Sequence, residues 1–489
     1  MSTTAEATLA DGTKLPYVVT DDPPRGGMKY TYFAPDKSYV VQFFNDPSIV
    51  AKSNIRKRLE SIIGRYNPTL PESAGGARGN TDTIAGYFAS KFCWPRAIVQ
   101  SPEFGIVCPA YPSNFFFTES ASQQLPLKGK DKKSNWFTSR NRRLLDSSEL
   151  GDFRSMLQIA IILARSIRRM HQAGLSHSDL SCNNVLIDPK SGTCIVIDID
   201  SLVVPGLYPP EVAGTQKYIA PEVLETMELP FTDSAKKLPC SSTDLHAMAV
   251  LIYEYFFMRH PLSGPKVFSS ESAEKDNYLA FGPEALFIED PNDTSNRPPD
   301  LKLTINDYGP AVRKMFLRSF VDGLHNPSAR PAAMEWEKVL TQAWDLLQPC
   351  PNPKCPGKWF ILHDASRPVC PFCGQSVRKG KDFVRLSLKS SFRGNSAQWR
   401  QAYEVNVYDG LPLLSWHVFS DVYPDEKADR KLLAYVNRVN GEWYLVNNGI
   451  QGLKSPAGNL VPAGAGIWLK EGAVFLMSEA NNGYLAEVR

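Results

Sequence analysis

Long apolar segments are missing from this sequence, and so is any strong excess of charge of one sign. No apolar run approaches the ~20 residues that a helix needs to cross a bilayer, and the first residues lack the basic-then-apolar pattern of a signal peptide. The chain carries 54 Lys and Arg against 51 Asp and Glu, a formal net charge of +3. This balance gives no reason to expect nucleic acid or a membrane as a partner. We expect a soluble, cytoplasmic protein.

Cysteine is sparse over most of the 489 residues and concentrated in one place. Five of the nine cysteines are scattered, mostly among apolar neighbours, which is typical of reduced thiols. The other four form two close pairs, Cys350 with Cys355 and Cys370 with Cys373, separated by a spacer of 14 residues. Two such pairs supply four thiolates for tetrahedral Zn²⁺ and leave no coordination position for water. The pattern predicts a structural zinc ribbon.

A polar loop in the middle of the chain carries residue types suited to phosphoryl transfer. An amphipathic helical pattern over residues 156–172 precedes it, and an apolar strand pattern that ends at Asp198 follows it. The loop contains Asp179 and Asn184. One carboxylate can accept the proton of a substrate hydroxyl, while the amide and the second carboxylate can bind magnesium. Because Asp and Asn are also common in ordinary turns, the assignment depends on motifs elsewhere.

Three further motifs follow this loop and narrow its interpretation. They are residues 214–222 (GTQKYIAPE), residues 242–254 around Asp244, and residues 326–331 around Arg330. With the loop, they resemble in order and spacing four motifs of the protein kinase superfamily: the catalytic loop, the end of the activation segment, the buried central helix and the late arginine. Aminoglycoside and choline phosphotransferases share the loop but lack the later motifs. A protein substrate is therefore favoured over a small molecule.

The resemblance implies an α+β, bilobal protein kinase fold and transfer of the ATP γ-phosphate to a protein serine or threonine. It makes Asp179 the base that orients the substrate hydroxyl. Asn184 and Asp198 become ligands of Mg²⁺ or Mn²⁺, and Thr215 becomes the hydrogen-bond partner of the catalytic Asp.

Three residues depart from the family's pattern. Ser178 stands in place of an arginine that pairs with a phosphorylated activation loop, Ser181 in place of a lysine that contacts the γ-phosphate, and Asp200 in place of a glycine. Asp200 fits a further magnesium ligand and the cap of a turn equally well. Ser181 and Asp200, together with Gln42 in the first lobe, favour the main alternative, a pseudokinase that binds nucleotide and acts as a scaffold, whereas the intact Asp179, Asn184 and Asp198 oppose it.

The first hundred residues resemble the smaller lobe of the same family, with one charge displaced. Predicted strands over residues 30–33 and 39–44 follow a turn that contains Gly26 and Gly27. Gln42 occupies the position of the family's phosphate-binding lysine. Lys29, at the end of the glycine turn, resembles the relocated lysine of the with-no-lysine kinases, and we expect it to point at the ATP phosphates.

Two further sites in this lobe are predicted from the same resemblance. Glu60, in a helix predicted over residues 48–66, is the candidate ion-pair partner of the lysine. The rival interpretation is a surface salt bridge to Arg56, Lys57 or Arg58. Apolar runs over residues 97–99 and 104–108 complete a small sheet. The hinge that receives adenine then falls on Pro109, Ala110 and Tyr111.

A strongly basic run follows the hinge. Such a run is usually a solvated loop. The alternative interpretation is a docking surface for an acidic partner beside the active site. The basic residues of the run are Lys128, Lys130, Lys132, Lys133, Arg140, Arg142 and Arg143, with Asp131 as the only acid.

The tail beyond the cysteines is predicted to be an all-β sandwich, because six short alternating strands are separated by Gly, Asn and Pro. The strands fall at residues 384–388, 413–419, 432–437, 442–446, 466–469 and 474–477. The segments 443–449 and 464–472 resemble a forkhead-associated domain. That resemblance implies a phosphopeptide partner, with Arg430 and Asn447 as the residues to test, although the family's Ser-x-x-His pattern is absent.

These features divide the chain into a protein kinase domain over residues 10–346, with lobes of about 10–110 and 111–346, a four-cysteine zinc ribbon over 347–380, and a forkhead-associated-like sandwich over 381–489. The order resembles bacterial kinases of tellurite-resistance and stress systems. It implies a von Willebrand-type protein and a serine/threonine phosphatase as partners, and ATP, Mg²⁺ and structural Zn²⁺ as cofactors.

Overall fold

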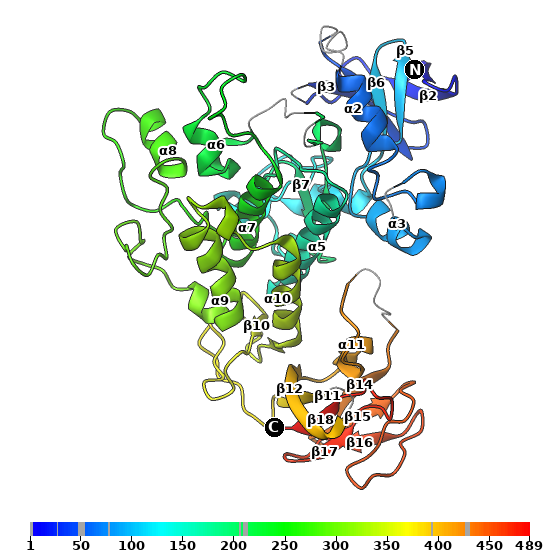
Figure 1. Cartoon of the computed structure of the whole chain (residues 1–489), viewed down its shortest axis with the longest axis vertical. Helices are drawn as coiled ribbons and strands as arrows, with labels where there is room; N and C mark the ends of the chain where they lie inside the picture. The colour runs from blue at the N-terminus through cyan, green and yellow to red at the C-terminus, as the bar shows by residue number, and fades with distance from the viewer. Residues whose placement is uncertain are drawn as a thin grey trace. The chain divides into compact units, whose positions relative to one another are not determined.

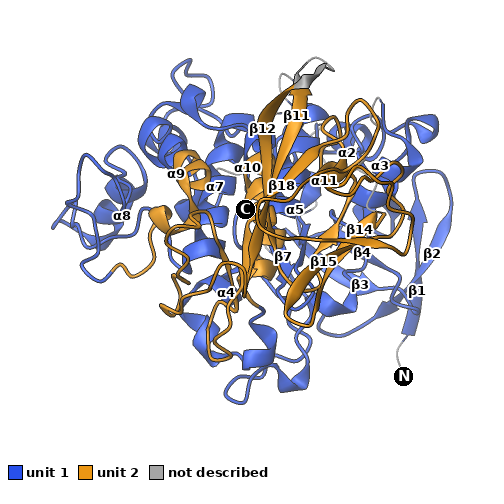
Figure 2. Cartoon of the chain, turned by 90° about the horizontal axis from the view of Figure 1, so that it is seen from below, with its two compact units in different colours: residues 1–151, 159–300, 316–336 blue, residues 152–158, 301–315, 337–489 orange. Residues whose placement is uncertain are grey.

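The computed structural model describes residues 3–26, 28–46, 54–76, 79–204, 207–208, 214–392, 395–425 and 431–489. Two of the predicted residues, Gly27 and Arg430, lie outside these ranges. The chain divides into two compact units (Figure 2). Unit 1 comprises residues 1–151, 159–300 and 316–336, and unit 2 comprises residues 152–158, 301–315 and 337–489. Across the described ranges, no helix combines the length and apolar character needed to span a membrane.

Unit 1 begins with an antiparallel six-stranded sheet in the order β2-β1-β5-β6-β4-β3. The four predicted strands are present, and β1 and β2 add two that the sequence did not predict, so the sheet begins before residue 10. The strands are β1 (Thr3–Leu9), β2 (Lys14–Val19), β3 (Lys29–Phe33), β4 (Tyr39–Phe44), β5 (Ala97–Ser101) and β6 (Gly105–Pro109).

Alternation along β4 explains how this sheet is packed on both faces. Val41 and Phe43 pack with residues of β1, β2 and β6 on one face. Val40 and Phe44 point to the other face, where they meet Leu59 and other apolar residues of α2 (Asn54–Ile63). This helix lies beside the sheet in Figure 1. It ends at Ile63, three residues before the end of the predicted helix, and residues 48–53 of that prediction lie outside the described ranges.

The rest of unit 1 is mainly helical and is built around α7 (Ser241–Phe257), whose residues from Ala247 to Phe257 are all buried. The apolar residues at helical spacing that precede the polar loop form the long helix α5 (Phe153–Gln172), and the loop leads into the hairpin of β7 (Val185–Asp188) and β8 (Thr193–Val196). The other helices in or entering this unit are α3 (Asp82–Ala89), α4 (Asn135–Thr138), α6 (Pro221–Glu225), α8 (Ala273–Phe281), α9 (Pro310–Leu317) and α10 (Ala333–Asp345).

Unit 2 contains a short hairpin and two four-stranded sheets with a common core. The hairpin pairs β9 (Leu347–Pro349) with β10 (Trp359–Ile361). One sheet has the order β12-β11-β18-β17 and the other β13-β14-β15-β16, and buried residues of both form one apolar cluster. The strands are β11 (Val384–Phe392), β12 (Asn395–Val407), β13 (Pro412–Leu413), β14 (Ala434–Val439), β15 (Glu442–Asn447), β16 (Gly466–Trp468), β17 (Val474–Leu476) and β18 (Leu485–Val488).

The segment 413–419 differs from its predicted form. Instead of one strand, it is the end of β13 followed by a single helical turn, α11 (Ser415–Val418). The Leu414 N–H donates to His417 Nδ1 at 3.0 Å, which caps this turn. An apolar run of this length does not distinguish a strand from a buried turn.

The start of α5 belongs to unit 2 and packs between the hairpin and the cysteine loop. The Phe153 ring stacks on Tyr308, with centroids 5.2 Å apart, and approaches Phe372 at 5.4 Å. The guanidinium of Arg154 lies 5.1 Å from the ring of Trp344 and 4.9 Å from that of Trp359. Segments distant in sequence thus share one aromatic cluster.

A buried polar cluster joins the end of α10 to the first sheet of unit 2. Asp345 accepts hydrogen bonds from Tyr403 Oη at 2.5 Å and from His417 Nε2 at 3.0 Å. Since His417 Nδ1 already accepts from a backbone N–H, its Nε2 carries the proton.

Replacing Asp345 with alanine should lower the free energy of unfolding by about 3 kcal/mol, because it leaves two buried donors without an acceptor. Tyr403→Phe is the matched control. It removes one donor and keeps the Asp345–His417 bond, and it should cost about 1 kcal/mol. Urea unfolding of both variants measures the difference. Equal losses would show that the carboxylate does not organise this cluster.

Candidate active site and cysteine cluster

The polar loop after α5 is fixed at its start by a carboxylate from α7. Asp244 Oδ2 accepts from the backbone N–H of His177 at 2.8 Å and lies 3.0 Å from His171 Nε2. On its other side, His177 Nε2 lies 2.9 Å from the carbonyl oxygen of Ile197. Asp244 is buried, so these contacts are shielded from water and tie the loop to both α7 and the segment after β8.

Within this loop, the side chains of Asp179, Asn184 and Thr215 come together. Asp179 Oδ1 accepts from the backbone N–H of Thr215 at 2.7 Å and from its hydroxyl at 2.8 Å. Asn184 Nδ2 donates to Asp179 Oδ2 at 3.0 Å and to the Asp179 carbonyl at 2.8 Å. Both oxygens of the carboxylate are therefore held in fixed directions by residues that the sequence analysis assigned to this site.

Gly214 permits this close approach. Its φ of +106° is unfavourable for other residues, and an added Cβ would lie 3.2 Å from the carbonyl oxygen of Ser178 and 3.6 Å from Asp179 Oδ1. Any larger residue here would strain the backbone beside the carboxylate.

Lys29 is the first residue of β3, directly after the glycine turn, and its side chain reaches the segment after β8. Its Nζ lies 3.3 Å from Asp198 Oδ1 and also contacts Asp200 Oδ1. The exposed fraction of the side chain is 11% for Lys29 and 9% for Asp200, against 44% for Asp198. Burial alone would lower the pKa of Lys29, but the charges of Asp200 and Asp198 outweigh it and raise the pKa above its ordinary value. The ammonium is therefore retained at physiological pH.

Glu60 is not the partner of this lysine, which corrects the predicted ion pair. Its side chain is 57% exposed and its carboxylate lies 3.3 Å from Arg56 Nε, one turn earlier on α2. The helix turns its apolar residues toward the sheet and leaves Glu60 on the outer face. The rival interpretation, a surface salt bridge, describes this residue. Asp200, rather than Glu60, forms an ion pair with Lys29. The sequence analysis interpreted Asp200 as a magnesium ligand or as the cap of a turn and did not predict this contact.

The residues around the expected nucleotide pocket have their own internal bonds. The N–H of Gly26 donates to the Lys29 carbonyl at 2.8 Å and closes the turn into β3. Pro109 ends β6, Ala110 donates its N–H to the Ser38 carbonyl at 3.3 Å, and the Tyr111 ring stacks on Phe116. Because Pro109 has no N–H and that of Ala110 is engaged, Tyr111 is the one of these three residues whose N–H is not used in these bonds.

Of the three residues that stand in place of family cations, Ser178 and Ser181 are buried and Gln42 is partly buried. The Ser181 side chain is fully buried, and its Oγ lies 3.2 Å from Thr215 Oγ1. Ser178 is buried as well and has a φ of +66°. Gln42, on β4, donates to Thr31 Oγ1 at 3.2 Å. Lys29 is the cation that the structure places on the carboxylates after β8.

Two buried contacts anchor the segment that ends at residue 222. Arg330 donates from both terminal nitrogens to the two carboxylate oxygens of Glu222, at 2.7 and 2.8 Å. The two residues belong to two of the motifs in the sequence, residues 326–331 and residues 214–222. Tyr218 donates its hydroxyl to Glu254 Oε2 on α7 at 2.8 Å.

Glu254 makes this anchor sensitive to pH. Burial raises its pKa from 4.5 to about 8, although the hydrogen bond from Tyr218 and the charge of Lys217 act in the opposite direction. A carboxyl whose pKa is higher in the folded protein binds more protons there. Its stabilisation is therefore complete below about pH 4.5 and is lost as the pH rises through about 8.

Substituting Gln for Glu254 should remove this pH dependence of the free energy of unfolding. Between the two pH limits, the contribution of Glu254 to that free energy changes by at most about 5 kcal/mol. Urea unfolding at pH 5.5 and pH 8 should show a larger loss of stability for the wild type than for the variant. Parallel pH dependence in the two proteins would contradict the assignment.

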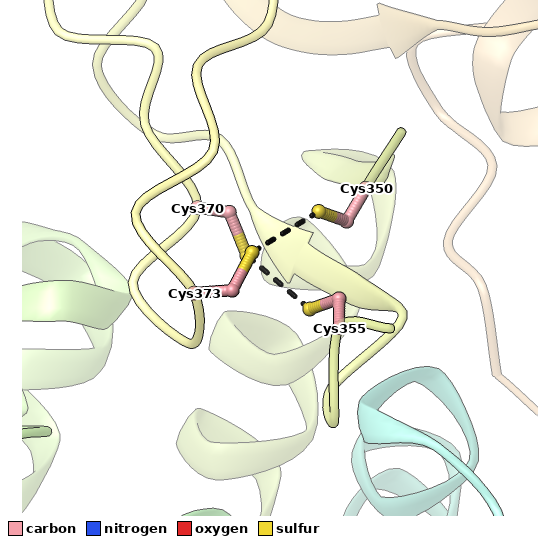
Figure 3. Close-up of side chains that lie close together, drawn as sticks. All are labelled: Cys350, Cys355, Cys370 and Cys373. Carbon is pink, nitrogen blue, oxygen red and sulfur yellow. Dashed lines mark hydrogen bonds between the residues drawn. The ribbon is translucent and has the colours of Figure 1, made fainter. Parts of the chain in front are cut away.

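The four clustered cysteines form a compact group of thiols. Their sulfur atoms all lie within 4.8 Å of one another, with 3.6 Å between Cys350 and Cys373 and 3.7 Å between Cys355 and Cys370. Figure 3 shows the side chains converging from the β9–β10 hairpin and the following loop. Tetrahedral zinc with bonds of about 2.3 Å requires sulfur–sulfur distances of about 3.8 Å, so the four residues fit this ion. His363 is not part of the group.

The comparisons with known proteins find a similarity to protein kinases over part of this chain. Residues 139–339 match the family model described as "Protein kinase domain". This range contains the polar loop, Thr215, α7 and Arg330, which are the features that the geometry brings together. Over these residues, the chain is therefore similar to protein kinase domains.

Similar proteins align over limited segments. The anti-Muellerian hormone type-2 receptor of Homo sapiens is 32% identical over 128 residues, which cover 21% of this chain and 22% of the receptor. Serine/threonine-protein kinase pkn3 of Myxococcus xanthus is 27% identical over 190 residues, which cover 36% of this chain and 28% of that kinase. The chain thus spans 22 to 28% of the length of these relatives. A rhoptry kinase structure from Toxoplasma gondii aligns with a TM-score of 0.42 and 14% identity over 70% of this chain and 85% of its own.

Proposed function

We propose that this chain is an ATP-dependent serine/threonine protein kinase. The observation that carries the proposal is the fixed arrangement of Asp179, Asn184 and Thr215. A carboxylate held by three donors keeps one direction for a substrate hydroxyl. The serine/threonine specificity is supported by the Thr215 hydroxyl on Asp179 and by the similarity to pkn3.

Asn184 and Asp198 are the residues proposed to hold magnesium. Because Asn184 Nδ2 is used by Asp179, the amide oxygen is the atom left for a metal, and Asp198 presents a carboxylate that is 44% exposed. Oxygen ligands of this kind fit Mg²⁺ or Mn²⁺. When bound, the ion would neutralise charge on the ATP phosphates.

The chain's own residues then share the remaining tasks. Asp179 orients the substrate hydroxyl and accepts its proton as the bond to the γ-phosphorus forms and the bond to the β-phosphate oxygen breaks. Lys29 supplies the positive charge for the phosphates, since Gln42 and Ser181 carry none. Asp200 holds the lysine in direction, which is the role that Glu60 cannot play from the outer face of α2. Gly26 and Gly27 are proposed to line the phosphates, and Pro109, Ala110 and Tyr111 the adenine.

Exchanging Lys29 for methionine should lower kcat/KM for ATP by about 100-fold or more, because one preorganised cation is lost from the phosphates. Glu60→Gln is the matched control, since it removes a carboxylate that lies on Arg56 at the surface, and it should change kcat/KM by less than about twofold. Steady-state assays at varied ATP concentration measure both. If Glu60→Gln lost as much activity as Lys29→Met, the assignment of Asp200 as the lysine's partner would fail.

The experiment that tests the function is incubation of the pure protein with Mg²⁺ and γ-labelled ATP, alone and with a general protein substrate. Label on serine and threonine is the expected result, and phosphoamino-acid analysis distinguishes it from label on tyrosine. Nucleotide binding, measured by calorimetry, serves as the control that the protein is folded. Tight binding of ATP without any transfer would identify the chain as a pseudokinase instead.

For the tail, we infer that Cys350, Cys355, Cys370 and Cys373 bind one structural Zn²⁺, supported by the fit of the sulfur distances. The forkhead-associated resemblance of the β-sheets receives less support. Asn447 is buried, donates to the carbonyls of Ile450 and Val461, and accepts from the N–H groups of Gly449 and Ile450. Its amide is saturated within its own turn, so phosphopeptide binding would have to rest on other residues.

The architecture also suggests which proteins to try first as substrate and as counterpart. These are a von Willebrand-type protein and a serine/threonine phosphatase of the same system.

A further inference from the structure

Five basic residues after the hinge, which we call the basic surface, have no acidic partner. They are Lys130, Lys133, Arg140, Arg142 and Arg143. In the part of the chain that the structure describes, none of them contacts a carboxylate. Cations of one sign gathered on 14 residues repel one another, so this surface favours an incoming anion.

The other two cations of the run are already neutralised, which corrects the sequence-based docking surface. Lys132 is buried, with its Nζ 2.8 Å from Glu149 Oε2 and 3.5 Å from Asp188 Oδ1. Lys128 pairs with Glu119 at 2.9 Å. Only the five residues of the basic surface remain for an external ligand.

Hydrogen bonds attach this segment to β7 and to the loop that precedes it. The Ser134 N–H donates to the Val185 carbonyl at 3.0 Å, and the Ile187 N–H donates to the Lys132 carbonyl at 2.9 Å. The Ser134 hydroxyl also donates to the carbonyl of Cys182, within the loop, at 3.3 Å. In the sequence, Lys133 lies between Lys132 and Ser134, the two residues of this segment that make these bonds. The basic surface therefore begins directly beside the loop that carries Asp179.

Arg142 is the residue of the basic surface with the clearest gain from an incoming anion. Its guanidinium is half-buried, and its Nη1 has a carbonyl oxygen of Phe137 at 3.5 Å. Burial lowers the pKa of this arginine because no carboxylate compensates for the lost water. A charge taken partly out of water is unfavourable until an opposite charge arrives.

We propose that the basic surface binds acidic side chains of the protein substrate, so that the kinase selects serine or threonine residues flanked by Asp or Glu. This proposal rests on the proposed function and names the substrate class of the same site. Guanidinium and carboxylate groups match in geometry, and the position beside the catalytic loop suits a peptide whose hydroxyl lies at Asp179. Binding of this kind lowers KM for the acidic substrate.

The test compares two serine peptides that differ only in Glu against Gln at the flanking positions. For the wild type, KM for the acidic peptide should be about tenfold lower than for the neutral peptide, and the ratio should approach one at 1 M salt. In the double variant Arg140→Gln/Arg143→Gln, at exposed positions, and in Lys133→Gln/Arg142→Gln, the ratio should fall toward one. Lys128→Gln is the matched control, because its charge is already paired, and it should keep the wild-type ratio.

Equal KM values for the two peptides in the wild type, or a preference for basic flanks, would overturn the proposal. So would tighter binding of DNA or of vesicles with anionic lipid than of the acidic peptide, measured with fluorescent ligands at equal salt. Absence of transfer to either peptide, together with absence of autophosphorylation, would refute the proposed function instead. In that case, peptide binding by fluorescence anisotropy decides the role of the surface. Binding of the acidic peptide that both double variants lose supports it, and no binding overturns it.

Discussion

Asn in place of Asp179 should reduce kcat for phosphoryl transfer by about 10²–10⁴-fold, the contribution of a positioned base. An amide cannot accept the proton of the substrate hydroxyl. It can still accept the two hydrogen bonds that Thr215 donates to Oδ1, at 2.7 and 2.8 Å, so the loop keeps one of its anchors. Affinity for ATP should change little, because Lys29 and Asp198 are untouched. Transfer of labelled phosphate gives kcat, and calorimetry gives the ATP affinity.

Thr215→Val is the matched control for this substitution. It removes one of the three side-chain and backbone donors to Asp179 and leaves the carboxylate and the Thr215 backbone bond in place. We expect a loss of about tenfold, since a hydrogen bond to a charged group is worth about 1.5–3 kcal/mol and only part of it affects the transition state. If Asp179→Asn retained more than a tenth of the wild-type kcat, Asp179 would not be the base.

The zinc site carries the second large effect. Loss of one thiolate through Cys370→Ser should reduce zinc from one ion per chain to almost none and unfold the region of the β9–β10 hairpin. Apparent binding free energies of four-ligand structural zinc sites are about 10–16 kcal/mol in small domains, far above what a two-strand hairpin supplies alone. Metal content by plasma emission and thermal unfolding with and without chelator measure both consequences.

Cys240→Ser provides the control for this prediction. Cys240 is a free cysteine outside the cluster, so its loss should leave the metal content at one ion per chain. Full zinc content in Cys370→Ser, or a wild-type protein that neither carries nor takes up zinc, would refute the site.

The sequence predicted best those parts of the fold whose signals are local. The strand β4 has the predicted bounds, and the cysteine spacing predicted four sulfur atoms that do converge. The first two strands were not predicted, because β1 consists of Thr, Ala and Glu up to Leu9 and its polar and apolar residues alternate only weakly. Residues 413–419 failed for a different reason: the capping bond to His417 that turns the chain is a property of the folded state.

The candidate site was predictable where a motif lists the residues, and not where their partners had to be chosen. Asp179, Asn184 and Thr215 come from recognisable motifs and meet in the structure. Lys29 and Asp200 are 171 positions apart, and nothing in the local pattern of either residue indicates the other. The side of α2 that faces the sheet decides against Glu60, and that depends on packing rather than on spacing.

The aromatic cluster around Phe153 and Arg154 bears on how such a chain could have been assembled in evolution. Phe153 and Tyr308 fall inside the segment that matches the protein kinase model, yet they pack with Phe372 and belong to the same compact unit as the tail. Gene fusion at a single junction therefore cannot exchange a tail of this kind. Any recombination that replaced the tail would have to supply a new partner for Phe153. The tail and the segment that matches the protein kinase model are therefore expected to be inherited together.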